Sequence, residues 1–315
     1  MNNMKRILID CDPGHDDMMA IMLASASEEV ELAGVTTVAG NQTGDKTFRN
    51  ACQVLTLIRE DAPAARGSDK PLVRDLLTAP QFHGQTGLDG ADLPPVGISP
   101  LDVHAADFII MTLEQSREKM ILVPTGPLTN IALALIKAPR IKEKIERIVL
   151  MGGGMHDFNV TPAAEYNIYV DPEAAKVVFE SGVPITMVGL DVTNRAIMTP
   201  EDIEALTVPG GKVSDVVVPL LRFFARANKD IFGIPGAPLH DALAVAAVID
   251  PGIVETKHLH VAVETAGVLT RGMTLVDFYG VTKQKPNVDV ALDLDARRFV
   301  VMMTAAIEKL NRKLG

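Results

Sequence analysis

The sequence contains no tryptophan and only 3 tyrosines and 10 phenylalanines, so few side chains are available to stack on a planar ligand. It has two cysteines, Cys11 and Cys52, and no Cys/His cluster with the spacing of a zinc site. We therefore expect reduced thiols and a cytoplasmic location. Because the sequence shows neither a signal-peptide pattern nor an apolar run long enough to cross a bilayer, we expect no association with a membrane.

Basic residues are also scarce. Lys and Arg number 30 against 40 Asp and Glu, which gives a net charge of −10 and a pI near 5.2. This balance disfavours nucleic acid and anionic membranes as partners and leaves small neutral or cationic molecules as candidate substrates. With 315 residues, 47% of them hydrophobic, the chain can bury a large core, and we expect a single domain over residues 1–315.

Strand and helix patterns alternate along most of the chain. The pattern predicts strands at 7–9, 31–39, 120–123, 148–151 and 185–190, and helices at 18–24, 44–60, 102–116, 172–182, 213–228, from 240 onward and at 296–314. Residues 258–294 show antiparallel strand patterns, and residues 163–170 are expected to be extended. Together these features predict an α/β fold, a doubly wound, mostly parallel open sheet of the Rossmann-like kind with a small antiparallel appendage. The segments 68–100 and 228–239 are expected to close over a substrate because of their length and Gly/Pro content.

The first predicted strand runs into an acidic turn at residues 10–17, DCDPGHDD. It holds four carboxylates, those of Asp10, Asp12, Asp16 and Asp17, which are costly to bury together unless a cation neutralises them. Helix starts favour acids through the helix dipole, and Asp-Pro-Gly is ordinary turn chemistry, so a purely structural explanation stays open. A single acid would satisfy a helix start, and four indicate a metal and substrate site.

Other polar residues also follow predicted strands, among them Asn41, Thr125 and Asp191, and His240-Asp241 opens a helix. The carboxyl ends of parallel strands converge at one edge of a sheet, so distant segments can build one pocket there. The candidate metal ligands are all oxygens, namely Asp12, Asp16, Asp17, Asp241 and the carbonyl of Thr125. Such a set selects a hard cation, Mg²⁺ or Ca²⁺, and suits Ca²⁺ better.

A cation held in this way could bind the vicinal hydroxyls of a sugar together with a water, and a neighbouring carboxylate could accept a proton from that water. Short polar side chains that could pair with sugar hydroxyls are Asn41, Asn159, Glu165 and Asn167. A lone asparagine in a loop serves equally well in a turn or a cap, so each of these assignments has a structural alternative.

Taken in order, these motifs resemble the inosine-uridine preferring nucleoside hydrolases over essentially the whole chain. The matching pieces are the DxDPGxDD motif at 10–17, GNQT at 40–43, HG at 83–84, PTG at 124–126, MGGG at 151–154, EYN at 165–167, DPEAA at 171–175, GLD at 189–191 and HD at 240–241. Each piece alone is weak evidence, and their common order is strong evidence.

The resemblance implies a Ca²⁺-dependent enzyme that hydrolyses the N-glycosidic bond of ribonucleosides, and relatives that are homodimers or homotetramers. It implies that Asp12 is the general base on the attacking water, that Asp10 supports the acidic turn, and that Asn41 and Met151 lie near the sugar and the water. The implied metal ligands are the carboxylates of Asp12, Asp17 and Asp241 and the carbonyl of Thr125. The implied ribose ligands are Asp16, Asn159, Glu165, Asn167 and Asp241.

Positive charge grows on the ribose ring during glycosidic cleavage, and the departing base needs a proton or a hydrogen bond. His83 and His240 are the candidate donors. Without tryptophan the base sandwich of purine-preferring relatives cannot form, and Asn228 and Phe232 precede the His-Asp pair, so we expect a preference for pyrimidines. Phe232 stands where some pyrimidine-preferring relatives have a tyrosine. The alternatives are broad inosine-uridine specificity, a phosphoryl-transfer enzyme with Asp10 as nucleophile, and a protein that binds calcium or nucleosides without catalysis.

Overall fold

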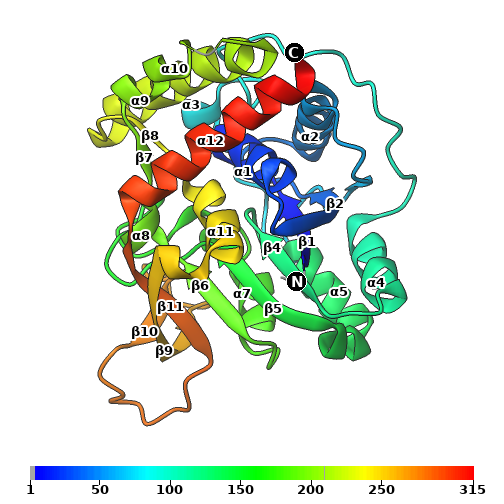
Figure 1. Ribbon diagram of the computed structural model, residues 1–315. Helices are drawn as coiled ribbons and strands as arrows, with labels where there is room; N and C mark the ends of the chain where they lie inside the picture. Colours follow the sequence, from blue (N-terminus) through cyan, green and yellow to red (C-terminus); the bar gives the residue numbers. More distant parts are fainter. Residues whose placement is uncertain (1–3, 209) are drawn as a thin grey trace.

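A nine-stranded sheet forms the centre of the computed structural model, which describes residues 4–208 and 210–315 (Figure 1). Its strands are β1 (Lys5–Cys11), β2 (Val30–Thr37), β3 (Ala64–Arg66), β4 (Met120–Pro124), β5 (Ile145–Met151), β6 (Ile185–Val188), β9 (Val254–Val263), β10 (Thr274–Asp277) and β11 (Val288–Leu294). Their order across the sheet is β10-β9-β11-β6-β5-β4-β1-β2-β3.

Neighbouring strands in the run β11-β6-β5-β4-β1-β2-β3 all pair in parallel. In contrast, β9 pairs antiparallel with both β11 and β10. The predicted doubly wound, mostly parallel sheet is therefore confirmed. The antiparallel strands continue the main sheet at one edge, and a separate two-stranded sheet joins β7 (Ile197–Met198) to β8 (Ala237–Pro238).

The first strand shows why the sheet is covered on both faces. Ile7 and Ile9 pack into one hydrophobic cluster, while Leu8, which points the opposite way, packs into the other. All three side chains are fully buried. A strand segment buried on both faces is apolar, as residues 7–9 of this strand are.

Helices fill the layers on the two faces. They are α1 (His15–Ala26), α2 (Gly44–Ile58), α3 (Pro80–His83), α4 (Ala105–Gln115), α5 (Thr129–Lys137), α6 (Tyr166–Val170), α7 (Pro172–Phe179), α8 (Leu190–Thr193), α9 (Pro200–Ala205), α10 (Lys212–Phe232), α11 (His240–Ile249) and α12 (Ala296–Leu314). The helices α4, α5 and α7 belong to the cluster on one face, and α1, α2, α10, α11 and α12 to the cluster on the other. Among the described residues, no helix combines the length and apolar character that a membrane span requires.

Two local predictions need correction. Residues 166–170 form helix α6 rather than an extended segment, because the Glu165 carboxylate accepts hydrogen bonds from the backbone N–H groups of Asn167 and Ile168 and so caps a helix start. The strand predicted at 185–190 ends at Val188, since Leu190 already begins helix α8. Inside the long segment 67–100, helix α3 forms and ends at His83.

The position of β1 in the sheet determines where a ligand can bind. In the sheet, β1 lies between β4 and β2. After β1 the chain adds β2 and β3 on one side, and it then crosses to the other side to add β4, β5 and β6. In doubly wound sheets, the crevice outside the carboxyl ends of the strands at such a reversal is the usual ligand site. The acidic turn leaves β1 at this crevice.

Candidate active site

A cavity of about 530 Å³ opens at this crevice. The predicted site residues that line it are Asp16, Asn41, His83, Thr125, Met151, Asn159, Glu165, Asn167, Asn228, Phe232, His240 and Asp241. Of the remaining two, Asp12 is 1% exposed and Asp17 is fully buried, and neither lines the cavity. Segments far apart in the sequence therefore meet around one volume.

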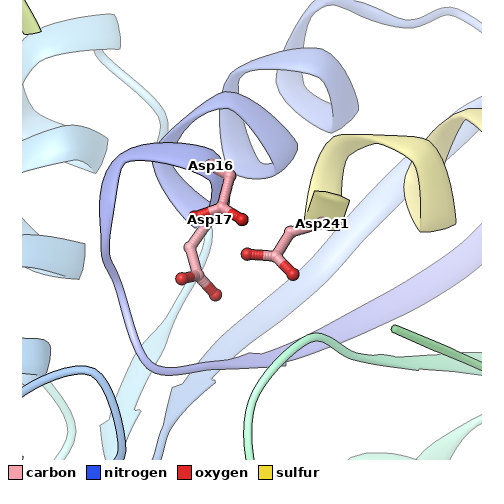
Figure 2. A group of neighbouring side chains, drawn as sticks. All are labelled: Asp16, Asp17 and Asp241. Atoms are coloured by element: carbon pink, nitrogen blue, oxygen red, sulfur yellow. The ribbon is translucent and has the colours of Figure 1, made fainter. Parts of the chain in front are cut away.

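An acid cluster of Asp16, Asp17 and Asp241 lies at the cavity floor, where Asp16 and Asp241 line the cavity and Asp17 is buried next to them. Oxygen atoms of these three carboxylates lie within 4.8 Å of one another, and all three residues are buried. Figure 2 shows Asp16 and Asp17 at the start of α1 facing Asp241 at the start of α11. Two helix N-termini thus direct their partial positive charge at the same group of acids.

Asp12 lies beneath the cavity, and its carboxylate is packed in space against Gly40 and Gly126. Its Oδ2 accepts a hydrogen bond of 2.6 Å from the backbone N–H of Asn41. A Cβ atom at Gly40 would lie 2.1 Å from Oδ2, and one at Gly126 would lie 2.6 Å from Oδ1. Only residues without a side chain leave room for this carboxylate.

Burial and mutual repulsion oppose ionisation of these acids. Burial raises the pKa of Asp16 to about 8, with a further rise from the neighbouring Asp17. It also raises the pKa of Asp17, and it raises the pKa values of Asp12 and Asp241 well above their usual range, with repulsion from nearby carboxylates adding to both. A cation among them would reverse this tendency.

The donor set fits a hard divalent cation. Every candidate ligand atom is an oxygen, and the cluster is buried. Within the described chain, Asp12 Oδ1 and Asp16 Oδ1 are buried without a hydrogen-bond partner. Buried carboxylate oxygens normally have such partners, so these two atoms are suited to coordination.

Thr125 and Asn167 border the acid cluster. The Thr125 hydroxyl donates to Asp17 Oδ1 at 2.8 Å, and its carbonyl oxygen accepts from Asn167 Nδ2 at 2.7 Å. The same amide nitrogen lies 3.2 Å from the carbonyl oxygen of Met151. Asn167 therefore ties the end of β4 to the end of β5 across the cavity wall.

Glu165 has a structural role in addition to its place in the lining. Besides capping α6, its carboxylate accepts a 2.8 Å hydrogen bond from the backbone N–H of Gly153. Burial raises its pKa to about 7, against the lowering effect of these three N–H donors. Asn159 is similarly engaged, since its Oδ1 accepts from the backbone N–H of Tyr166 at 2.9 Å.

Aromatic side chains and the two predicted histidines line another part of the cavity. Phe82 of α3 and Phe232 of α10 stack with ring centroids 5.2 Å apart. His240 Nδ1 lies 2.8 Å from the hydroxyl oxygen of Thr193, and burial lowers the His240 pKa to about 4. Burial also holds the pKa of His83 well below its usual range. Asn228 donates to the carbonyl of Phe224, one turn earlier in α10.

Sequence reasoning missed several residues that support the site. The Tyr166 hydroxyl lies 2.8 Å from the carbonyl oxygen of Gly40 and 2.6 Å from that of Leu77, so it bridges two walls of the cavity. Thr193 contacts His240, as described above. Thr193 lies just after the GLD motif at 189–191, and that position was the sequence signal for it. Tyr166 lies inside the EYN motif at 165–167, and the motif assigns it no role.

Comparison with known proteins gives a consistent result. The family model described as inosine-uridine preferring nucleoside hydrolase matches residues 7–301. A pyrimidine-specific ribonucleoside hydrolase RihA of Citrobacter koseri is 49% identical over 299 residues, covering 94% of this chain and 96% of that protein. The RihA of Escherichia fergusonii is 48% identical, with 96% and 98% covered.

Solved structures agree in fold. A purine-preferring ribonucleoside hydrolase from Gardnerella vaginalis superimposes with a TM-score of 0.92 at 34% identity, covering 98% of this chain and all of that one. A plant nucleoside hydrolase, the PpNRh1 enzyme, gives a TM-score of 0.90 at 31% identity, with 98% and 99% covered.

Proposed function

The chain belongs to the inosine-uridine preferring nucleoside hydrolase family, and from this premise we propose that it is a calcium-dependent hydrolase of pyrimidine ribonucleosides. Its activity class is that of a ribonucleoside hydrolase, an N-glycosidase. The metal, the preferred base and the roles of individual residues are our proposal. The observation that carries it is the acid cluster of Asp16, Asp17 and Asp241 at the floor of a cavity large enough for a nucleoside.

In this proposal, Asp12, Asp17 and Asp241 hold Ca²⁺ through their carboxylates, with the carbonyl of Thr125 as a further ligand. The all-oxygen set and the partnerless Oδ1 of Asp12 support this choice. When bound, the cation would raise the acidity of a water molecule and hold two hydroxyls of the ribose. Asp16, which we assign to ribose, lies close enough to Asp17 and Asp241 to share the charge of the cation.

The protein's own groups then divide the work. Asp12 accepts the proton of the attacking water as general base, and its Oδ1 has no hydrogen-bond partner among the described residues. Ribose hydroxyls pair with Asp16, Asn159, Glu165, Asn167 and Asp241, while Asn41 and Met151 border the sugar and the water. The carboxylates beneath the ring stabilise the positive charge that develops on it during cleavage.

Departure of the base requires a donor in the cavity. When the N-glycosidic bond breaks, its electron pair goes to the base nitrogen, and we assign His240 and His83 to supply a proton or a hydrogen bond to the base. Both line the cavity, and Thr193 engages Nδ1 of His240, so Nε2 is the nitrogen left for the substrate. Burial lowers the pKa of both rings, so near pH 7 they are mostly neutral and donate a hydrogen bond through one N–H, while the protonated form of either ring is a stronger acid than an ordinary imidazolium.

The preference for pyrimidines is supported by the RihA relatives at 48–49% identity. The shared fold does not decide this point, because the Gardnerella vaginalis protein of similar fold is purine-preferring at 34% identity. We place the base between Asn228 and the Phe82–Phe232 stack. Broad inosine-uridine specificity is the alternative outcome of the test.

The test is a substrate panel of uridine, cytidine, inosine and p-nitrophenyl phosphate, each incubated with the protein in the presence of Ca²⁺ or of a chelator. We expect reducing ribose from uridine and cytidine, little from inosine, and none after chelation. Equal rates on inosine would favour broad specificity. Phosphate release without ribose release would overturn the proposal.

A further inference from the structure

A second buried histidine, His15, lies behind His83 and has no role in the chemistry proposed above. It is the first residue of α1 and is fully buried, while His83 is 6% exposed. Their ring centroids are 5.5 Å apart. His83 lines the cavity and His15 does not, so His15 can act on a substrate only through His83.

The ring of His15 is held from several sides. Its Nε2 lies 2.8 Å from the backbone carbonyl oxygen of Asp89, and its faces stack on Phe223 and Phe224 with centroids 5.4 Å and 5.2 Å away. A carbonyl oxygen can only accept, so Nε2 of His15 carries a hydrogen. In the neutral ring, Nδ1 is then a bare acceptor.

That acceptor faces His83. The two Nδ1 atoms are 3.3 Å apart, and the backbone nitrogen of His15 is also 3.3 Å from Nδ1 of His83. A ring nitrogen cannot donate and accept at once, so the two contacts serve the two protonation states of His83 Nδ1. When it is bare it accepts from the backbone N–H, and when it is protonated it donates to the ring of His15.

We propose that His15 is a positioning residue for His83, which fixes Nδ1 on the buried side and leaves Nε2 for the departing base. The inference rests on the proposed function, since it gives His83 a base to assist. In the doubly protonated ring, His83 passes its Nε2 proton to the base nitrogen that receives the electron pair of the broken N-glycosidic bond, and the proton left on Nδ1 donates to the ring of His15. A Cβ atom at Gly14 would lie 2.4 Å from His83 Nδ1, so the glycine of the acidic turn permits this approach.

Three substitutions separate the contacts of His15. His15→Asn puts an amide near the position of Nδ1 and keeps a partner for His83. His15→Gln reaches the position of Nε2 and loses that partner, and His15→Phe keeps the stacked ring and loses both hydrogen bonds. Each variant is assayed with Ca²⁺ on uridine, whose base needs a proton, and on p-nitrophenyl ribofuranoside, whose phenolate leaves without one.

For His15→Gln and His15→Phe we expect kcat on uridine to fall about 10- to 100-fold, as for partial loss of a general acid, with KM changed less than about threefold. On p-nitrophenyl ribofuranoside kcat should stay within about threefold of wild type, because no proton is needed at departure. His15→Asn should recover most of the uridine rate. If His15 had a role in folding alone, the variants would lower kcat on both substrates by the same factor.

The matched control is Phe223→Leu, which removes a stacking contact of His15 and leaves its hydrogen bonds in place. It should lower the melting temperature without changing the ratio of the two rates. The inference is overturned if His15→Gln and His15→Phe change both rates equally or change neither. If wild type cleaves the p-nitrophenyl riboside and no nucleoside, the proposed function fails instead.

A measurement on wild type covers the case in which the variants fold poorly. Long-range ¹H–¹⁵N correlation spectra of the calcium-loaded protein report which nitrogen of each imidazole carries hydrogen. We expect His15 with hydrogen on Nε2 and a hydrogen-bonded Nδ1 on His83. A His15 ring with hydrogen on Nδ1 alone would overturn the inference regardless of activity.

Discussion

The two ends of the cavity are built in different ways. At the floor, the acid cluster comes from the first turns of α1 and α11 and is buried against the sheet. At the mouth, Phe82 comes from a four-residue helix and Phe232 from the last residue of α10, where it is 44% exposed. The floor therefore depends on the central sheet, whereas the mouth depends on segments that can vary without disturbing the core.

This difference suggests a division of tasks. The groups that we assign to the metal and the water are buried, and the aromatic groups that we assign to the base lie on segments where sequence change costs less stability. The relatives include a pyrimidine-specific and a purine-preferring ribonucleoside hydrolase, which is consistent with such a division. The four predictions that follow test it, beginning at the floor.

The largest effect is expected for Asp12→Asn. Without a base to accept the proton of the water, kcat on uridine should fall by about a thousandfold or more, at the upper end of the range for general bases. Ribose release measures the rate, and circular dichroism checks that the fold persists. Asp191→Asn is the control, because Asp191 follows β6, lies outside the cavity lining and accepts from the backbone N–H groups of Met155 and His156. A rate within tenfold of wild type for Asp12→Asn would refute the assigned base.

The second-largest effect is expected for removal of the metal. Activity should fall by at least about a hundredfold, and the stability of the metal-free protein should depend markedly on pH. The folded pKa of Asp16 is about 8 and its ordinary value is 3.8. Between these values the folded state binds more protons than the unfolded state, so the free energy of unfolding falls as the pH rises. Chelated protein should melt at a lower temperature at pH 8 than at pH 5, and added Ca²⁺ should reduce that difference. An equal difference with and without Ca²⁺ would argue against a cation at the acid cluster.

At the mouth we expect a smaller effect that falls on binding. Phe232→Ala removes one ring of the Phe82–Phe232 stack, and an aromatic contact contributes about 0.5–1.5 kcal/mol, so KM for uridine should rise about 2- to 13-fold with little change in kcat. Steady-state rates on uridine and inosine measure the change and any shift in preference. Tyr279→Ala, at an 88% exposed position outside the cavity lining, is the control. A fall in kcat without a change in KM would contradict the division between floor and mouth.

The smallest effect is expected where the two ends are connected. Tyr166→Phe removes the hydroxyl that lies within hydrogen-bond distance of Gly40 near the floor and Leu77 near the mouth. One lost hydrogen bond costs about 1 kcal/mol, so we expect a melting temperature lower by a few degrees and KM raised about two- to threefold. Thermal melting and uridine kinetics provide the readouts. Unchanged values in both would show that the two ends are held independently.

The sequence predicted the fold because apolar runs such as residues 7–9 are distinctive and alternate with helical patterns. It also predicted which polar residues share the cavity, because parallel strands end at one edge and the family motifs lie at those ends. The mouth was harder to predict. Helix α3 lies within the segment 68–100, for which no helix was predicted. Helix α10 was predicted to end at Asn228 and continues to Phe232.

Contacts between distant side chains could not be predicted. His15 occupies a position that the DxDPGxDD motif does not specify, and its partner His83 is 68 residues away, so no local pattern joins them. Glu165 was expected to bind ribose, and its capping of α6 depends on a helix that the sequence did not indicate. Calcium, the oligomeric state and the cytoplasmic location stay predictions.

The two glycines that flank Asp12 have a consequence for altering this protein by mutation. Each oxygen of the carboxylate is adjacent to a position where even a methyl group would lie at 2.1 Å or 2.6 Å, far inside the closest approach of such atoms. The pocket for Asp12 is therefore defined by two residues that have no side chains and lie 86 positions apart in the sequence. Replacing Asp12 with the longer glutamate would displace one strand end or the other, so the length of the acid at this position and the packing of the sheet cannot be varied separately.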